Sequence, residues 1–355
     1  MSPVDLRSDV LSRPSVEMVE AMLRVAREPA HFGLREDPRQ QELERQMAEL
    51  VGQEDALLFP TCTMANEVGL MLLTRPGDTV AAPRDVHMAT SEANAAAVLS
   101  GVRLEFLPGD APLPPLTEWQ AMASRKSDAQ NPPVSTFLIE NSHNRSGGAV
   151  IDEHSTMALS NLAKNHGIKL MIDGARLFNA AIALGASPAA LARHADAISI
   201  SLNKSLGAPN GAILAGSRAL IERALVLRQR LGGGIRPTGM LSAAGLVAIA
   251  SWTRLAEDQS RAKRLAEGLT ALPGLSVVAP ATNIVVISIK APGPTSQELC
   301  AHLAAHGVLV LPFGADRIRM VIYRDIDDDT VDATIAATRK SIEELASEGR
   351  FGARA

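Results

Sequence analysis

The sequence is poor in aromatic residues and in cysteine. Phe, Trp and Tyr make up 3% of its 355 residues, Tyr323 is the single tyrosine, and the only cysteines are Cys62 and Cys300. These two cysteines show no metal-ligand or disulfide spacing, which favours a reducing, cytoplasmic location. The sequence has no run of about eighteen apolar residues and no signal peptide, which argues against a membrane protein. A net charge of -4 with scattered basic residues argues against nucleic-acid and membrane-surface partners.

Alternating helical and strand patterns fill the middle of the chain. Between residues 40 and 250, apolar runs such as "VSTFLIEN", "IKLMIDGA" and "AISIS" alternate with helical patterns such as "QQELERQMAELV". This order is typical of βαβ units and predicts an α/β domain with a mostly parallel sheet over residues 1–243. A long helix from about residue 244, followed by strand, helix, strand and helix patterns, predicts a smaller α+β domain over residues 244–355.

Polar residues follow the ends of several predicted strands. "KLMID" ends at Asp173, "AISIS" leads into Lys204, and "TFLIE" leads into His143. Ligands of parallel α/β sheets bind at the carboxyl ends of the strands. A lysine, an acid and nearby arginines at one edge therefore indicate a covalent amine site with a charged cofactor.

Each of these groups has a role if the cofactor is pyridoxal phosphate. Lys204 can form a Schiff base with the aldehyde, and Asp173 can keep the pyridine nitrogen protonated. The turn containing Cys62 and Thr63 precedes an apolar helix, whose first N–H groups suit a phosphate. His87 follows another strand and can stack on the ring.

Simpler interpretations exist for every one of these residues. Lys204 alone is typical of a surface loop, Asp173 before glycine is typical of a turn, and "TCT" suits a helix N-cap. His143 can belong to a surface hydrogen-bond network. The simple interpretations leave the order of the motifs unexplained.

The ordered motifs resemble those of the threonine aldolase / β-eliminating lyase family, whose members are pyridoxal-phosphate enzymes with the aspartate-aminotransferase fold. The motifs span nearly the whole chain and are "DLRSDV", "EDP", "PTCTMAN", "ENSHNRSGG", "DGARLFNAAIALG", "SLNKSLGAPNGAILAG" and "LGGGIR". The family's "HxxxxE" spans His87 to Glu92, and its late "RxV" spans Arg319 to Val321. The resemblance implies the type I fold of these enzymes, with a seven-stranded, mostly parallel sheet flanked by helices.

The resemblance also implies a role for each matching residue. Lys204 is expected to be the Schiff-base lysine, Asp173 the partner of the pyridine nitrogen and His87 the stacking histidine. The other cofactor contacts are expected from Cys62, Thr63, Arg176 and Arg236, the last at the phosphate or at a subunit interface. The substrate's α-carboxylate is expected to contact Ser8, Arg176 and Arg319.

The reaction implied is retro-aldol cleavage of a β-hydroxy-α-amino acid to glycine and an aldehyde, in a homodimer or homotetramer. His143 is the first candidate for the base that takes the β-hydroxyl proton, directly or through a water, and His87 is the second. Three alternatives remain open: a β-eliminating lyase, a racemase or decarboxylase on the same scaffold, and a non-catalytic protein that binds the cofactor.

Several residues depart from the family pattern. Cys62 stands at the glycine of the family's "SGT" turn, and "HFGLREDP" carries Phe32 for tyrosine with Leu34 and Arg35 inserted. "RMVIY" has Ile322 and Tyr323 at the places of threonine and histidine. These departures concern the identity of the substrate more than that of the cofactor.

Overall fold

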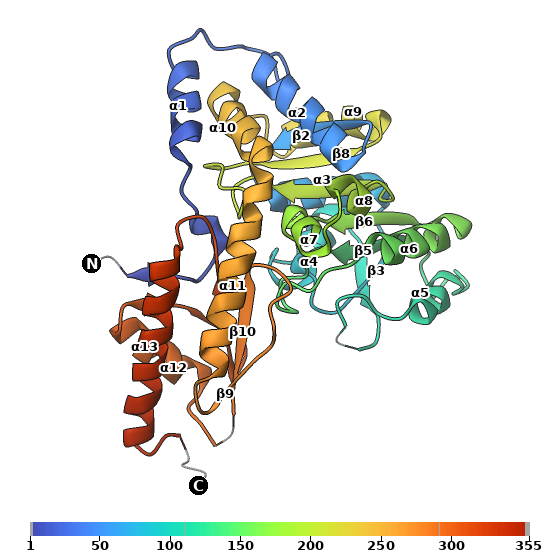
Figure 1. Ribbon diagram of the computed structural model, residues 1–355. Helices are drawn as coiled ribbons and strands as arrows, with labels where there is room; N and C mark the ends of the chain where they lie inside the picture. The colour runs from blue at the N-terminus through green and yellow to red at the C-terminus, as the bar shows by residue number, and fades with distance from the viewer. Residues whose placement is uncertain (1–2, 110, 291, 352–355) are drawn as a thin grey trace. The chain divides into compact units, whose positions relative to one another are not determined.

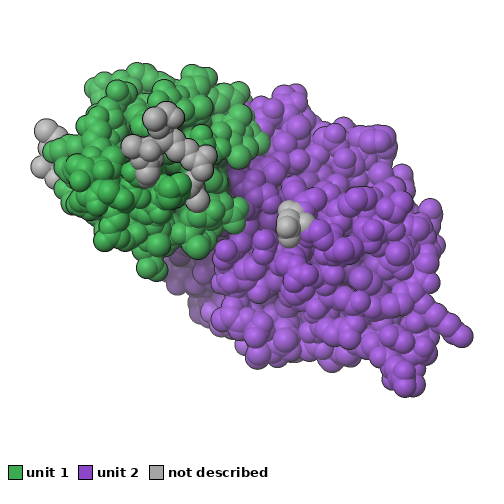
Figure 2. Space-filling view, turned by 90° about the horizontal axis from the view of Figure 1, so that it is seen from below, with its two compact units in different colours: residues 1–13, 253–355 green, residues 14–252 purple. Residues whose placement is uncertain are grey.

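The computed structural model describes residues 3–109, 111–290 and 292–351 (Figure 1). The chain forms two compact units, one made of Pro14–Trp252 and one made of Met1–Arg13 with Thr253–Ala355 (Figure 2). We call them the large and the small unit. No single described helix is long and apolar enough to cross a membrane, although Gly239–Ala250 and Trp252–Thr270 pass that test together as a bent pair.

A seven-stranded sheet forms the centre of the large unit. Its strand order is β2-β8-β7-β6-β5-β3-β4. The bounds are β2 (Asp55–Phe59), β8 (Ala212–Gly216), β7 (Ala197–Ser201), β6 (Lys169–Asp173), β5 (Val134–Glu140), β3 (Thr79–Ala82) and β4 (Arg103–Phe106). Only β8 runs antiparallel to its neighbours. The prediction of a mostly parallel seven-stranded sheet is confirmed.

Helices cover both faces of this sheet. They are α1 (Val16–Val25), α2 (Pro38–Val51), α3 (Cys62–Leu73), α4 (His87–Thr90), the π-helical η2 (Ala96–Ser100), α5 (Leu116–Ala123), α6 (Glu153–Asn165), α7 (Leu177–Leu184), α8 (Pro188–Ala192), α9 (Arg218–Arg230) and α10 (Gly239–Ala250). Leu57 and Phe59 of β2 pack into the apolar cluster under α3 and α9. Leu58 points to the opposite face, and its N–H donates to Glu44 of α2. Strands covered on both sides are mostly apolar, and β7, which reads "AISIS", is fully buried, with the Ser199 hydroxyl donating to Asn66.

The small unit is built on a four-stranded antiparallel sheet of order β12-β13-β10-β9. Its elements are β1 (Val4–Asp5), the 3-10 helix η1 (Asp9–Leu11), α11 (Leu255–Thr270), β9 (Leu275–Val277), β10 (Ile284–Ile289), α12 (Ser296–Ala305), β11 (Val308–Leu309), β12 (Leu311–Pro312), β13 (Arg317–Val321) and α13 (Asp328–Ser347). An α+β unit was predicted for this part of the chain.

The division of the chain differs from the expected boundary between residues 243 and 244. Residues 1–13 belong to the small unit, because β1 pairs in parallel with β11 and Leu6 lies in the small unit's core. The expected single long helix is also interrupted: α10 ends at Ala250, and α11 begins after a 3-10 turn at Trp252–Arg254. At the break the Ser251 hydroxyl donates to the carbonyl of Val247 at 2.9 Å, a bond that competes with continued helix.

Candidate active site

Three parallel strands end side by side at one edge of the large unit's sheet. In the strand register, Glu140 at the end of β5 lies opposite Asp173 at the end of β6, and Asp173 lies opposite Ser199 of β7. Lys204 is the third residue after the end of β7. The topology therefore brings two acids and the lysine to one place, which we call the carboxyl edge.

Asp173 is held as a buried carboxylate by two N–H donors. It is 2% exposed; its Oδ1 accepts from Ala175 N at 3.0 Å and its Oδ2 from Asn66 Nδ2 at 3.1 Å. The next residue must be glycine, because a Cβ at Gly174 would lie 2.8 Å from the Ser199 carbonyl. Each carboxylate oxygen can accept a second bond, so Asp173 can still receive a cationic ring N–H.

His87 forms a pair with Glu92. Its Nδ1 lies 2.8 Å from Glu92 Oε1, and this hydrogen bond is the main reason why the pKa of His87 is raised. The charge of Asp173 acts in the same direction, while burial and the positive charge of Lys204 oppose it. His87, Glu92, Asp173 and Lys204 thus act on one another within one electrostatic site.

Asn66 of α3 joins the acids of this site. Its Nδ2 donates to Glu92 Oε1 at 2.9 Å as well as to Asp173, and its Oδ1 accepts from the Ser199 hydroxyl at 2.5 Å. The serine fixes the orientation of the amide, so that its donors face the carboxylates. The Asn66 amide therefore donates to both carboxylates, Glu92 and Asp173, at once.

His143 lies in a different environment. It is 1% exposed, its Nδ1 accepts from Ser146 N at 3.2 Å, and its Nε2 is buried with no hydrogen-bond partner among the described residues. A neutral imidazole whose Nδ1 accepts a bond carries its proton on Nε2. In this tautomer Nε2–H of His143 can donate a hydrogen bond, and Nε2 has no free lone pair with which to take a substrate proton.

Glu140 connects these two histidines. Its Oε2 accepts from the backbone N–H of His87 at 2.7 Å, and its Oε1 accepts from that of Asn144, the neighbour of His143, at 2.8 Å. Burial, followed by the charge of Asp173, raises the pKa of Glu140. The end of β5 therefore sets the backbone positions of both candidate bases.

The N-terminus of α3 offers backbone donors for an anion. Thr61 caps it, with Oγ1 accepting from Met64 N at 3.1 Å. The N–H groups of Cys62 and Thr63 lie in the first turn, where a helix has no carbonyl partners of its own. Burial, and secondarily Asp173, raise the pKa of the Cys62 thiol to about 11, against the effects of Lys204 and the hydroxyls of Ser199 and Ser201. Cys62 is therefore a neutral thiol at physiological pH.

Sequence comparison assigns the chain to a family. The β-eliminating lyase family matches residues 5–292, and the low-specificity L-threonine aldolase 1 of Arabidopsis thaliana is 34% identical over 349 residues, which are 96% of this chain and 97% of that protein. The chain belongs to the β-eliminating lyase family. Another relative, the alanine racemase TOXG of Cochliobolus carbonum, is 30% identical over 93% of this chain and 85% of that protein.

A solved structure supports the fold of this β-eliminating lyase family member. The threonine aldolase of Leishmania major superposes with a TM-score of 0.83 at 19% identity, covering 96% of this chain and 100% of that one. At this identity the likeness shows the fold, which is the expected pyridoxal-phosphate transferase architecture.

The carboxyl edge has the donor set that pyridoxal phosphate needs. The half-buried Lys204 suits the aldehyde. The buried Asp173, which accepts from two N–H groups, suits the ring nitrogen, and the capped N-terminus of the twelve-residue helix α3 suits the phosphate. Lys204, Asp173, Cys62 and Thr63 are the residues that would hold the cofactor. Their individual roles stay predictions.

The remaining predicted residues lie elsewhere in the two units. Arg176 is 7% exposed and precedes α7 directly after the Asp173 turn. Arg236 is exposed, with its guanidinium 5.2 Å from the ring centroid of Phe32. Ser8 and Arg319 belong to the small unit, where Arg319 Nη2 donates to the carbonyl of Arg7 at 2.9 Å and so lies beside Ser8. The carboxylate-binding role of these residues stays a prediction.

Four of the residues that depart from the family's sequence pattern have structural contacts. Ile322 and Tyr323 are buried in the core of the small unit, and the Tyr323 hydroxyl donates to Asp5 O at 2.7 Å. Arg35 forms an ion pair with Glu44 at 2.8 Å, and the Leu34 carbonyl accepts from Arg228 at 3.0 Å. Both segments therefore stabilise the fold.

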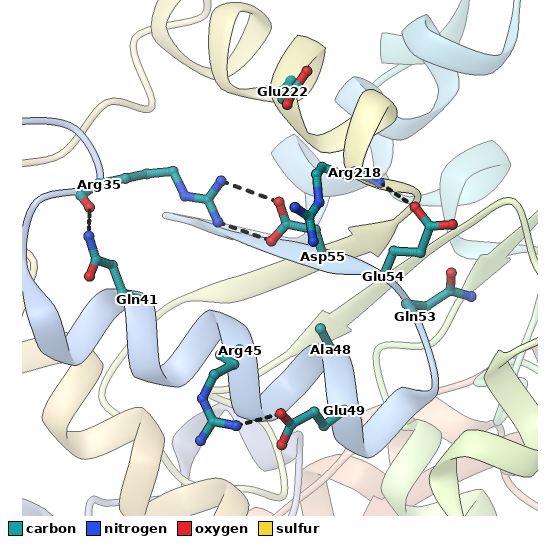
Figure 3. Close-up of a pocket in the computed structure, with 10 residues that line it drawn as sticks. All are labelled: Arg35, Gln41, Arg45, Ala48, Glu49, Gln53, Glu54, Asp55, Arg218 and Glu222. Carbon is teal, nitrogen blue, oxygen red and sulfur yellow. Dashed lines mark hydrogen bonds and ion pairs between the residues drawn. The ribbon is translucent and has the colours of Figure 1, made fainter.

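A surface cleft of about 550 Å³ lies at the opposite, amino ends of the parallel strands, which we call the amino edge (Figure 3). It surrounds Asp55, the first residue of β2, which pairs with the last residue of β8. Several of its polar groups bind one another: Arg35 contacts Asp55 at 3.1 Å, Arg45 contacts Glu49, and the backbone N–H of Arg218 donates to Glu54. Ligands of parallel α/β sheets bind at the carboxyl ends of the strands, and this cleft lies at the amino ends, so it is not the candidate active site.

Sequence reasoning assigned no role to Asn66, Glu92 or Glu140. Asn66 and Glu92 stand inside motifs that were recognised, and Glu140 ends a predicted strand. One signal was available for Asn66: a buried side-chain amide on a mostly apolar helix needs a polar partner. The identity of that partner could not be derived, since Glu92 and Asp173 are distant in sequence.

Proposed function

We propose that this protein is a pyridoxal-phosphate-dependent lyase that cleaves β-hydroxy-α-amino acids of the L-threonine type to glycine and an aldehyde. The family membership and the threonine aldolase relative support the reaction class. Pyridoxal phosphate supplies an aldehyde that bonds amines and a ring that accepts an electron pair when a bond to the α-carbon breaks.

The observation that carries the proposal is the pairing of His87 with Glu92. A carboxylate that accepts from Nδ1 places the imidazole proton there and leaves the lone pair of Nε2 able to take a proton. Cleavage of a β-hydroxy amino acid requires such an acceptor for the hydroxyl proton. His87 therefore takes precedence over His143, whose tautomer makes it a donor.

The other residues of the carboxyl edge have complementary tasks. Lys204 provides the amine that holds the cofactor by its aldehyde, and Asp173 keeps the ring nitrogen protonated because its own charge is stabilised by two N–H donors. The proton that His87 removes from the hydroxyl balances the one that glycine gains at its α-carbon. The net reaction needs neither an oxidant nor a second substrate.

A second candidate activity is racemisation. It is supported by the similarity to the alanine racemase TOXG, and it requires only removal and return of the α-proton beside Lys204. The His87–Glu92 pair has no task in racemisation of alanine, which is why we rank it below cleavage.

We also propose that the protein works as a homodimer or homotetramer in the cytoplasm. Assembly is supported by exposed apolar side chains on α1 and beside Arg236, namely Val16, Val19, Leu23 and Phe32. The location is supported by two free thiols, Cys62 and Cys300. Sedimentation velocity of the full chain measures the assembly.

The deciding experiment mixes cofactor-loaded protein with L-threonine, L-allo-threonine, β-phenylserine and L-alanine, and measures glycine, aldehyde, pyruvate and D-alanine separately. Glycine with an equal amount of aldehyde is the expected result. Pyruvate without glycine would assign the protein to β-elimination, and D-alanine alone to racemisation. The absence of all four products would contradict the proposal.

A further inference from the structure

A second buried glutamate, Glu67, neighbours Glu92. Glu67 of α3 is 1% exposed and follows Asn66, the residue that joins Glu92 to Asp173. One helical turn later on the same face, Leu70 packs against Val86, Met88 and Ala96 of the segment that carries Glu92. Glu67 therefore projects into an apolar environment in which Glu92 is its polar neighbour.

The oxygens of this pair lack donors. Both carboxylate oxygens of Glu67 and Oε2 of Glu92 are buried with no hydrogen-bond partner among the described residues, whereas Oε1 of Glu92 contacts His87 and Asn66. Besides burial, both the charge of Glu92 and a hydrogen bond with its side chain raise the pKa of Glu67, so the two carboxyl groups are neighbours. An ionised carboxylate can only accept hydrogen bonds, so Glu67 and Glu92 can form a hydrogen bond only if one of them is protonated.

The surroundings decide which of the two carries it. The charged residues near Glu67 come from two places. His87 and Glu92 lie on α4 and the turn after it, and Asp173 at the end of β6 is linked to α3 by its bond to Asn66. The nearby elements β3 and η2 contain no charged residue. His87 and Asn66 stabilise negative charge on Glu92, while no described residue donates a hydrogen bond to Glu67. Burial, and secondarily Glu92, raise the pKa of Glu67 to about 8.

We infer that Glu67 is a positioning residue of the candidate active site: it donates a carboxyl proton to Glu92 Oε2 and so holds the opposite oxygen of Glu92 against His87. The hydrogen-bonded series of Glu67, Glu92 and His87 then has one carboxyl proton, on Glu67, and one negative charge, on Glu92. Loss of the Glu67 proton at alkaline pH places two buried negative charges side by side and disturbs the Glu92–His87 contact. This inference deepens the proposed function, but its tests use no turnover, so either can fail without the other.

The protonation of Glu67 can be measured directly by infrared spectroscopy of the full chain, with and without pyridoxal phosphate. The carbonyl stretch of a protonated carboxyl is well separated from that of a carboxylate. At pH 7, Glu67→Gln should remove one protonated-carboxyl band from the wild-type spectrum, and Glu222→Gln, at an exposed position on α9, should remove none. Identical wild-type and Glu67→Gln spectra in this region would overturn the inference.

The pH dependence of the free energy of unfolding should also report the protonation of Glu67. An acid whose pKa is raised on folding is protonated in both states at low pH, and only the unfolded state loses the proton as pH rises above the ordinary value of 4.5. The folded state is therefore progressively destabilised up to about pH 8. Glutamine does not titrate, so the unfolding constant of the wild type should rise relative to that of Glu67→Gln by up to about tenfold per pH unit in this window. A constant ratio across the window contradicts the inference.

The positioning role is separated from simple burial by comparing Glu67→Gln with Glu67→Leu. Glutamine keeps an N–H donor toward Glu92, whereas leucine keeps the volume without a donor. The pH dependence of diethyl pyrocarbonate labelling of His87, measured by mass spectrometry, reports the pKa of its imidazole. We expect Glu67→Gln to match the wild type and Glu67→Leu to shift the titration upward, since Glu92 then keeps more negative charge facing His87. Equal His87 titrations in the two variants would refute the positioning role.

Discussion

The two edges of the large unit's sheet use charge in opposite ways. At the amino edge, Asp55 is paired with Arg35, and Lys169 with Asp196 at 3.1 Å. At the carboxyl edge, Asp173 and Glu92 are bonded to the amide of Asn66 rather than to an arginine. Both edges hold acids, but Asp55 and Asp196 are bonded to cations, whereas Asp173 is bonded to neutral N–H donors.

This difference has a physical reason. An ion pair neutralises both partners and contributes mostly to stability, by little when it is exposed. An amide or backbone N–H stabilises a carboxylate without cancelling its charge, so the acid can still act on a neighbouring imidazole or on a bound cation. A buried carboxylate bonded to neutral N–H donors, Asp173, therefore distinguishes the site from the surface cleft, where Asp55 is paired with Arg35 (Figure 3).

The largest expected effect is that of Lys204→Ala. Removal of the amine should abolish the visible absorbance of the bound cofactor and lower the rate of glycine release by at least about 10³-fold. Lys169→Ala, which breaks the amino-edge pair with Asp196, is the matched control and should keep both. Retained turnover in Lys204→Ala would refute the assignment of the active lysine.

Asp173→Asn should be the next most damaging change. It keeps the shape of the side chain but removes the charge that would pair with the ring nitrogen, and we expect kcat to fall roughly 10²-fold. Asp55→Asn is the control at the other edge, where the lost ion pair with Arg35 should change stability and leave kcat unaltered. Equal kcat values for the two variants would remove the distinction between the edges.

Glu92→Gln should shift the pH dependence of activity. His87 acts as a base only when neutral, and its raised pKa places the acidic limb of kcat/KM above the ordinary value of 6.5. Glutamine still accepts from Nδ1 but carries no charge, so the limb should move toward lower pH by about one unit. A pH profile measured from pH 5 to 9 with L-threonine tests this, and an unmoved limb would mean that His87 is not the base.

Arg45→Ala should have the smallest effect. Arg45 contacts Glu42 and Glu49 on the exposed face of α2, where water and salt screen the interaction. Both kcat and the midpoint of urea unfolding should equal those of the wild type. A large loss of activity would show that the cleft at the amino edge takes part in function.

Much of the fold was predictable because its signals are local. The buried strands read as apolar runs, the polar residues that follow them mark the carboxyl edge, and Thr61 has the side chain of a helix cap. The break after Ala250 was not predicted, since the helical periodicity continues through it. The docking of residues 1–13 on the small unit was missed for another reason: a two-residue strand such as Val4–Asp5 has no recognisable pattern and exists only because β11 pairs with it.

The sequence by itself determined which residues stand at the ends of the strands, and therefore that Asp173, Lys204 and His143 would meet at one edge. Only the tertiary structure decided what each of them can do. Ser146 N–H donates to Nδ1 of His143, whereas Glu92 contacts Nδ1 of His87, and our proposal of His87 as the base rests on that difference. Tautomers and proton positions depend on burial and on partners distant in the chain, so no local pattern of residue types encodes them.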